Sequence, residues 1–426
     1  MIKLEEFESD LPYGPWLSRG CDVWDAICAA VNGDAGALGR LLERDSKLAK
    51  YDQPLYFAVR EGHLDAAQVL LDTGADSGEE LLTVARDRGH ERVAQLLEET
   101  RARRGRIKPA EADHPIHVTA AGGDAERVRA LLDAEPQLVH LSDRAGGTPL
   151  HRAVAASARE VVKLLLDRGA DLHALHGAGP GSERGYAAVD LQPIDLAFWS
   201  GPFWGVRGDI ETARLLLERG ATYDLVIASA LGDFERVQGF LDEDPKRIAE
   251  ARPSGKRALS SAVEFGHEPI VRMLLDRGAD PNWPEGSNAP RGAAVHAAAR
   301  VGNRPVVELL LAHGADPNLP NWQHATPLHD LCGRDARGRP RVHRLECAAI
   351  FLDAGATISA KDEDYRSTPL AWAARCNLPD MVEFLLSRGA PTNLPNDKPW
   401  ATPLAWATKR GHQQIIDILR VAGAKS

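Results

Sequence analysis

Residues 148–171 read TPLHRAVAASAREVVKLLLDRGAD, a line that holds the start and end signals of two consecutive helices. Thr148 is a residue type that caps helices, and Pro149 suits the first helical position because it needs no backbone donor there. Self-similarity of this kind predicts a repeat array. Similar lines recur with a period of about 33 residues, at 53–76, 257–280, 293–316, 368–390 and 402–424.

The copy at 257–280, RALSSAVEFGHEPIVRMLLDRGAD, indicates why each unit needs its neighbours. Gly266 can adopt a positive φ and so separates two antiparallel helices. In the second helix Val271, Leu274 and Leu275 recur at helical spacing and form one apolar stripe. A single unit cannot bury this stripe, so successive units are expected to stack and create a continuous core.

These lines resemble the ankyrin repeat, with its T-P-L-H opening, A-A-x-x-G-H turn and V-x-x-L-L-x-x-G-A ending. The resemblance covers nearly the whole chain from about residue 22, and we expect a multi-repeat array of the bacterial type. It implies an all-α solenoid of about twelve helix-turn-helix units with protruding finger loops.

The repeat pattern also predicts how the chain is organised. Residues 1–21 lack the pattern and are expected to cap a first block of repeats at 22–100. The basic stretch 101–112 is expected to be a solvated linker or an irregular connection, and a second block covers 113–426. In that block, loops are lengthened at about 174–190, 198–208, 283–292 and 333–343.

The composition limits the classes of function. A formal net charge of −10 argues against general nucleic-acid binding, which needs a cationic face. No stretch approaches the roughly 18 uninterrupted apolar residues of a membrane span, and the acidic start of the chain lacks the features of a signal peptide. We expect a cytoplasmic monomer without a cofactor. Its cysteines are scattered, odd in number and expected to be reduced thiols: Cys21, Cys28, Cys332, Cys347 and Cys376.

One repeat is interrupted. Thr326 and Gly355 are 29 positions apart, whereas Thr148 and Gly169 are 21 apart. The extra residues fall between the two helices of the pair, and 198–208 lengthens the same connection in another repeat. Two interpretations remain open: an exposed loop whose length costs little stability, or a pair of insertions that form a site.

Aromatic residues gather near these lengthened loops. Trp372 and Trp406 occupy a helix position where packing between repeats is expected. Loop tryptophans are less easily explained, because exposed tryptophans without a partner are uncommon. Side chains on adjacent fingers could form an aromatic row that suits a protein partner or an apolar ligand. The members of this row would be Trp283, Trp322, Tyr365 and Trp400, while Trp199 and Trp204 are candidates in the helix-to-helix insertion at 198–208.

The most interesting titratable residue is Asp330, because an acid beside tryptophans can act as a general acid or base. The other interpretation is a solvated carboxylate paired with an arginine of the insertion. Its neighbour His329 is expected to hydrogen-bond backbone, as this repeat position usually does. Neither a metal-binding spacing nor a known catalytic motif occurs in the sequence. Companions of Asp330 in one groove would be Arg291, Asp362, Asp364, Tyr365 and Arg366.

Two classes of function follow. The first is a protein-interaction scaffold that binds a partner on its concave palm and finger loops, as the resemblance implies. The alternative is a small-molecule-binding protein or enzyme whose pocket is built from the insertions and the aromatic fingers, with Asp330, Asp364 and Arg366 as its catalytic residues.

Overall fold

The computed structural model describes residues 12–13, 18–106, 114–143, 146–175, 191–200, 206–207, 209–252, 255–285, 292–321, 323–333 and 343–425. Contacts between Cα atoms divide the chain into two compact units, Met1–Thr222 (the N-terminal unit) and Tyr223–Ser426 (the C-terminal unit).

The N-terminal unit is built from helix pairs with two short antiparallel strand pairs, β1 with β2 and β3 with β4. Its 3-10 helices are η2 (Ser46–Lys50) and η3 (Pro136–His140). Its strands are β1 (Pro12–Tyr13), β2 (Ser18–Arg19), β3 (Trp199–Ser200) and β4 (Val206–Arg207). Its helices are α1 (Gly20–Asn32), α2 (Ala35–Arg44), α3 (Asp52–Glu61), α4 (Leu64–Asp72), α5 (Glu79–Asp87), α6 (Glu91–Arg106), α7 (Pro115–Gly122), α8 (Ala125–Ala134), α9 (Pro149–Ala155), α10 (Arg159–Asp167), α11 (Pro193–Phe198) and α12 (Ile210–Glu218).

The C-terminal unit continues the helix pairs, so the described residues hold twelve pairs in all, which confirms the predicted all-α array. Its 3-10 helices are η4 (Pro245–Ala249) and η5 (Pro399–Ala401). Its α-helices are α13 (Leu225–Leu231), α14 (Phe234–Glu243), α15 (Ala258–Phe265), α16 (Glu268–Asp276), α17 (Ala294–Val301), α18 (Arg304–Ala312), α19 (Pro327–Cys332), α20 (Arg344–Asp353), α21 (Pro369–Arg375), α22 (Pro379–Ser387), α23 (Pro403–Arg410) and α24 (Gln413–Val421).

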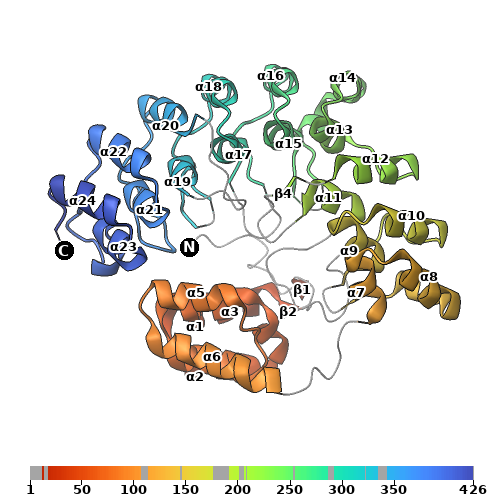
Figure 1. The fold of residues 1–426 in the computed structure, drawn as a ribbon, viewed down its shortest axis with the longest axis horizontal. Helices are drawn as coiled ribbons and strands as arrows, with labels where there is room; N and C mark the ends of the chain where they lie inside the picture. Colours follow the sequence, from red (N-terminus) through yellow and green to blue (C-terminus); the bar gives the residue numbers. More distant parts are fainter. Residues whose placement is uncertain are drawn as a thin grey trace. The chain divides into compact units, whose positions relative to one another are not determined.

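Within the C-terminal unit the first helices of the pairs form the inner layer and the second helices the outer layer (Figure 1). Buried side chains from both layers make one core that extends from Leu225 to Leu419. The apolar stripe predicted in α16 belongs to this core, since Val271, Leu274 and Leu275 are all buried. Stacking of repeats therefore buries what a single helix pair would expose.

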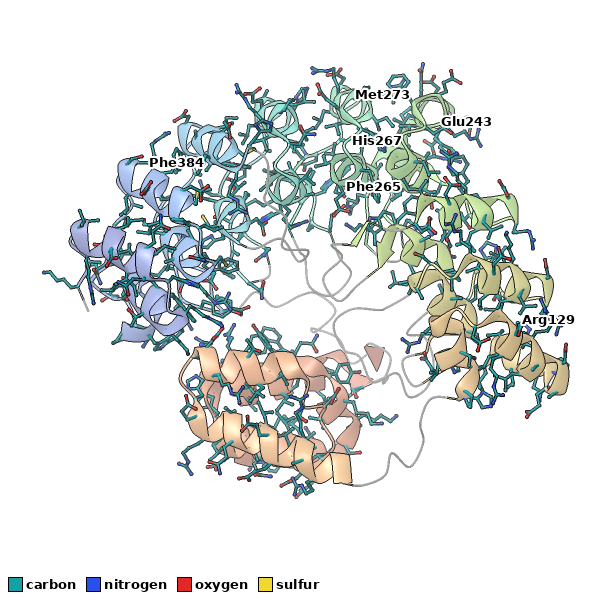
Figure 2. The ribbon with its side chains drawn as sticks, viewed as in Figure 1. Arg129, Glu243, Phe265, His267, Met273 and Phe384 are labelled. Atoms are coloured by element: carbon teal, nitrogen blue, oxygen red, sulfur yellow. The ribbon has the colours of Figure 1, made fainter. Side chains whose placement is uncertain are left out.

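The turn between the two helices of a pair depends on a glycine and a histidine. Gly232 ends α13 with φ 79°, a left-handed conformation that favours glycine. A Cβ atom at this position would lie 2.6 Å from the ring of His267, so this ring also requires glycine there. The His267 ring in turn bonds the Ala230 carbonyl of the preceding repeat at 3.0 Å (Figure 2). The glycine-histidine pair thus joins neighbouring repeats.

In the two repeats that contain T-P-L-H, the histidine joins the repeat to the next finger. The backbone N–H of Thr326 donates to Nδ1 of the buried His329 at 3.1 Å, which leaves Nε2 as the donor to the Ser367 carbonyl at 3.2 Å. His151 makes the equivalent bond to the Leu191 carbonyl at 3.1 Å. These bonds confirm the expectation that His329 hydrogen-bonds backbone.

Asparagines at the finger bases make a further joint between repeats. The Asn282 carboxamide donates to the Gly314 carbonyl at 2.9 Å and accepts from the backbone N–H of Asp316 at 2.8 Å. Asn318 makes the same two bonds, to the Gly355 carbonyl and to the backbone N–H of Thr357. The carboxamide of each asparagine therefore bonds backbone groups of the following repeat.

Two further observations concern the predicted organisation. Helix α6 continues to Arg106, so residues 101–106 of the expected linker are helical, while 107–113 lie outside the described residues. The division between 22–100 and 113–426 stays a prediction. In the described part of the chain, no helix has the length and apolar character needed to cross a membrane.

Candidate functional site

Three of the residues predicted to contact a partner or ligand, Trp204, Arg291 and Trp322, lie outside the described residues. So do 176–190, 201–205, 208, 286–291 and 334–342 of the lengthened loops. The site is therefore built from the predicted residues that the structure describes, which are Trp199, Trp283, Asp330, Asp364, Tyr365, Arg366 and Trp400.

Four aromatic side chains of the last two repeats pack edge to face in one group, here named the aromatic cluster: Tyr365, Trp372, Trp400 and Trp406. The centroid of the Tyr365 ring lies 5.8 Å from that of Trp372 and 5.7 Å from that of Trp406. The Trp400 ring lies 6.1 Å from Trp406 at an interplanar angle of 90°. Such edge-to-face pairs are favourable beyond the area they bury. Two members of the predicted row, Tyr365 and Trp400, are thus brought together.

Hydrogen bonds hold the aromatic cluster in place. The buried Asp362 carboxylate accepts from the indole N–H of Trp372 at 3.1 Å and from the backbone N–H groups of Tyr365 and Ser367 at 2.7 and 2.9 Å. The Ser367 hydroxyl accepts from the indole N–H of Trp406 at 2.9 Å. Asp362, predicted as a companion of Asp330, therefore organises the finger. Trp406 is fully buried and Trp372 partly so, which agrees with the packing expected for both.

Arg375, the last residue of α21, adds a cation to the aromatic cluster. Its guanidinium carbon lies 4.1 Å from the Tyr365 ring centroid and 5.3 Å from that of Trp406. The Lys409 ammonium lies 5.8 Å from the Trp406 centroid. Cations at these distances are attracted to aromatic rings. The cluster is therefore aromatic and positively charged on two successive repeats.

Sequence reasoning missed Arg375, although the repeats carry a signal for it. The seventh residue of three first helices is a cation: Arg300 in α17, Arg375 in α21 and Lys409 in α23. The fourth residue of the next first helix is its neighbour across the repeat boundary. Arg300 thus lies 3.5 Å from the Asp330 carboxylate, and Arg375 lies over the Trp406 ring. Comparing the seventh residue of one first helix with the fourth residue of the next first helix therefore predicts the Arg300–Asp330 and Arg375–Trp406 contacts.

Asp330 lies in a second group, with His296 and Arg300. Its Oδ2 atom lies 2.7 Å from Nδ1 of the buried His296, whose Nε2 lies 2.8 Å from the Leu319 carbonyl. Both ring nitrogens of His296 thus lie within hydrogen-bond distance of oxygen atoms. In the copy at 293–316, Ala293 replaces the threonine that bonds Nδ1 elsewhere, which explains why this ring pairs with a carboxylate. The contacts favour a structural role for Asp330.

Further charges extend this group along the inner layer. The Arg300 guanidinium lies 3.9 Å from the Glu264 carboxylate, which lies 2.7 Å from the Lys256 ammonium. Lys256 in turn lies 3.6 Å from the Glu285 carboxylate. Burial raises the pKa of Glu285 to about 7, against the opposing effect of Lys256. A buried carboxyl that changes charge near neutral pH therefore lies at the base of the 283–292 finger.

The Glu285→Gln variant is expected to lose less stability than the unchanged chain as the pH rises from about 5 to 8. The pKa of Glu285 is higher in the folded chain than in the unfolded chain. Its contribution to the free energy of unfolding is therefore full below the pKa of the unfolded chain, and it is lost as pH rises through the pKa of the folded chain. The difference is on the order of 1–3 kcal/mol. Urea unfolding followed by circular dichroism checks it. Glu268→Gln, which alters an exposed ion pair with Arg272, serves as the control. Parallel pH profiles for Glu285→Gln and the unchanged chain would contradict the expectation.

The remaining predicted residues do not join the aromatic cluster through the contacts described. Asp364 is buried and accepts a hydrogen bond from the side-chain amide of Gln323. Arg366 is exposed. The half-buried Trp283 ring has the Arg257 guanidinium 5.1 Å from its centroid. In the described residues, no group of three or more His, Cys, Asp or Glu side chains is arranged to hold a metal ion.

Trp199, a candidate in the lengthened connection between two helices, is buried in the N-terminal unit. Only 2% of its surface is exposed, and its ring lies 5.4 Å from that of Phe198. Trp199 lies in the strand pair β3–β4, where its backbone is opposite that of Arg207. We therefore leave Trp199 out of the interaction surface.

Comparison with protein families matches most of the repeats found above. A family model described as "Ankyrin repeats (3 copies)" matches residues 81–175 and 341–425. A second, described as "Ankyrin repeat", matches 52–80, 254–284 and 293–322. Together these matches cover more than half of the chain.

Similar proteins share the repeats over limited parts of their length. Ankyrin repeat protein nuc-2 of Neurospora crassa is 25% identical over 61% of this chain and 24% of its own. Human inversin is 36% identical over 32% of this chain and 14% of its own. Human 2-5A-dependent ribonuclease is 30% identical over 45% of this chain and 26% of its own. The matches thus span about a quarter or less of these relatives, and nothing in them indicates a bacterial origin.

Proposed function

Since the chain belongs to the ankyrin-repeat family, we propose that it is a protein-interaction module whose partner binds the inner layer and fingers of the C-terminal unit. Ankyrin repeats are generally protein-interaction modules, and fold alone leaves the partner open. The observation that carries the proposal is the aromatic cluster, where Tyr365 and Trp400 are half-exposed on successive fingers beside Arg375.

Several properties of the aromatic cluster support a role as a binding hot spot. Trp, Tyr and Arg are the residue types that dominate interface energies. Hydrogen bonds to Asp362 and Ser367 fix the rings of Trp372 and Trp406. Tyr365 and Trp400 pack against the fixed Trp406 ring before a partner arrives, which lowers the entropy cost of binding. We place the contact residues at Tyr365, Arg366 and Trp400, with Arg375 beside them.

A photo-crosslinking amino acid in place of Trp400 is expected to give a covalent adduct with a protein of the native host. The same amino acid in place of Phe234, an exposed aromatic on the outer helix α14, is expected to give none. Adducts are identified by mass spectrometry from full-length protein.

Equal adduct formation at both positions would contradict the proposal. Stabilisation by a metabolite that is lost in Trp400→Ala, without any protein adduct, would support the small-molecule alternative instead.

A further inference from the structure

We propose that the partner segment bound at the aromatic cluster is acidic and extended, and that it is held by a set of cations here named the basic palm: Arg366, Arg375, Lys398, Lys409 and Arg410. This inference rests on the proposed function and specifies the chemistry of the partner.

Exposed charge in this region has a single sign. Residues 357–378 and 391–412, all described, contain the two fingers and the first helices α21 and α23. The exposed charged side chains in these two segments are all cations, namely Arg366, Lys398, Lys409 and Arg410. A chain of net charge −10 thus presents a positive surface on the fingers and first helices of its last two repeats.

The acids of the same segments are withdrawn from solvent or paired. Asp362 and Asp364 are buried. Glu363 lies 3.4 Å from His324, and Asp397 lies 2.6 Å from Lys361. Because these carboxylates are engaged within the protein, they reduce the positive potential at the surface less than exposed acids would.

The position of the cations indicates an extended segment. Arg366 and Lys398 lie on successive fingers. Arg375 and Lys409 occupy corresponding positions of α21 and α23, the first helices of successive repeats. The set therefore follows the stacking direction of the repeats. Carboxylates spaced along an extended chain can pair with several of its members, and arginine can bind a carboxylate through two parallel hydrogen bonds.

The aromatic side chains favour a polypeptide over a nucleic acid. Half-exposed Tyr365 lies beside the Arg375 guanidinium, and half-exposed Trp400 packs against Trp406, whose ring lies near the Lys409 ammonium. Both can take an apolar side chain of the same segment. The negative charge of the whole chain disfavours a long polyanion more strongly than a short acidic peptide.

The test measures fluorescence anisotropy of a labelled peptide of about twelve residues, in which glutamates alternate with leucines, in about 0.05 M salt. The full-length chain is compared with Lys409→Glu/Arg410→Glu. The matched control is Arg272→Glu/Arg420→Glu, which makes the same change of charge on the outer helices α16 and α24. Circular dichroism verifies that all three proteins are folded.

We expect Lys409→Glu/Arg410→Glu to raise the Kd for the peptide about tenfold or more, and the control variant to change this Kd less than about twofold. No binding by the unchanged chain, or equal weakening in both variants, overturns the inference. Tighter binding of an oligonucleotide of the same charge overturns it as well. If Lys409→Glu/Arg410→Glu still forms the adduct from position 400 but its peptide binding is unchanged, the proposed function is supported and the inference of an acidic partner segment is contradicted.

Discussion

Replacing Trp406 by alanine is expected to lower the free energy of unfolding by about 3–5 kcal/mol, as in other buried large-to-alanine substitutions. The side chain is fully buried, and its indole N–H donates to the Ser367 hydroxyl. Its ring also contacts Tyr365 and Trp400, so the substitution removes the centre of the aromatic cluster.

Urea unfolding of the full-length chain, followed by circular dichroism, measures the effect. Because repeat arrays unfold in parts, the transition assigned to the C-terminal unit is the one to compare. Trp400→Ala is the control, since this half-exposed tryptophan is at the edge of the cluster and is expected to cost clearly less. A loss in Trp406→Ala no larger than in Trp400→Ala would show that the ring is not a core residue.

Acid is expected to destabilise the C-terminal unit through His329. Burial lowers the pKa of this histidine to about 4, from the ordinary value of 6.5. As pH falls below 6.5 the unfolded chain takes up a proton at this residue, while the folded chain does not until about pH 4. The stabilising contribution is therefore full above pH 6.5 and is lost toward pH 4, with a size of up to about 3 kcal/mol.

His329→Gln tests this expectation, because glutamine keeps one acceptor and one donor but does not titrate. The variant is expected to be less stable than the unchanged chain at pH 7 and to lose less between pH 7 and 4. His140→Gln replaces an exposed histidine of the N-terminal unit and should leave the acid dependence of the C-terminal unit as it is. If the acid dependence of His329→Gln matches that of the unchanged chain, the titrating group lies elsewhere.

The sequence was sufficient to predict the helix pairs, because their signals are local. Thr326 and His329 lie three positions apart in one helix start, and the apolar residues of α16 repeat at helical spacing. The core position of Trp406 also followed from alignment of the repeats. These features depend on one repeat and on its resemblance to the others.

Contacts between repeats were harder to predict. Asp330 contacts His296 and Arg300, which are 34 and 30 positions away and lie on the preceding first helix. They become neighbours only through stacking, so reasoning within one repeat does not find them. The burial of Trp199 was also not predicted: the sequence indicated a lengthened connection, whereas Trp199 lies in the strand pair β3–β4 and only 2% of its surface is exposed.

The asparagine joints at Asn282 and Asn318 have a consequence for how such a chain changes over generations. Each joint binds only backbone atoms of the next repeat, at Gly314 and Gly355, so it makes no demand on neighbouring side chains. A gene segment that encodes one repeat can be duplicated, lost or exchanged, and the new neighbour still meets a compatible joint. Fingers and inner helices can then diverge under selection for new partners, while the asparagine joints between repeats remain compatible with one another.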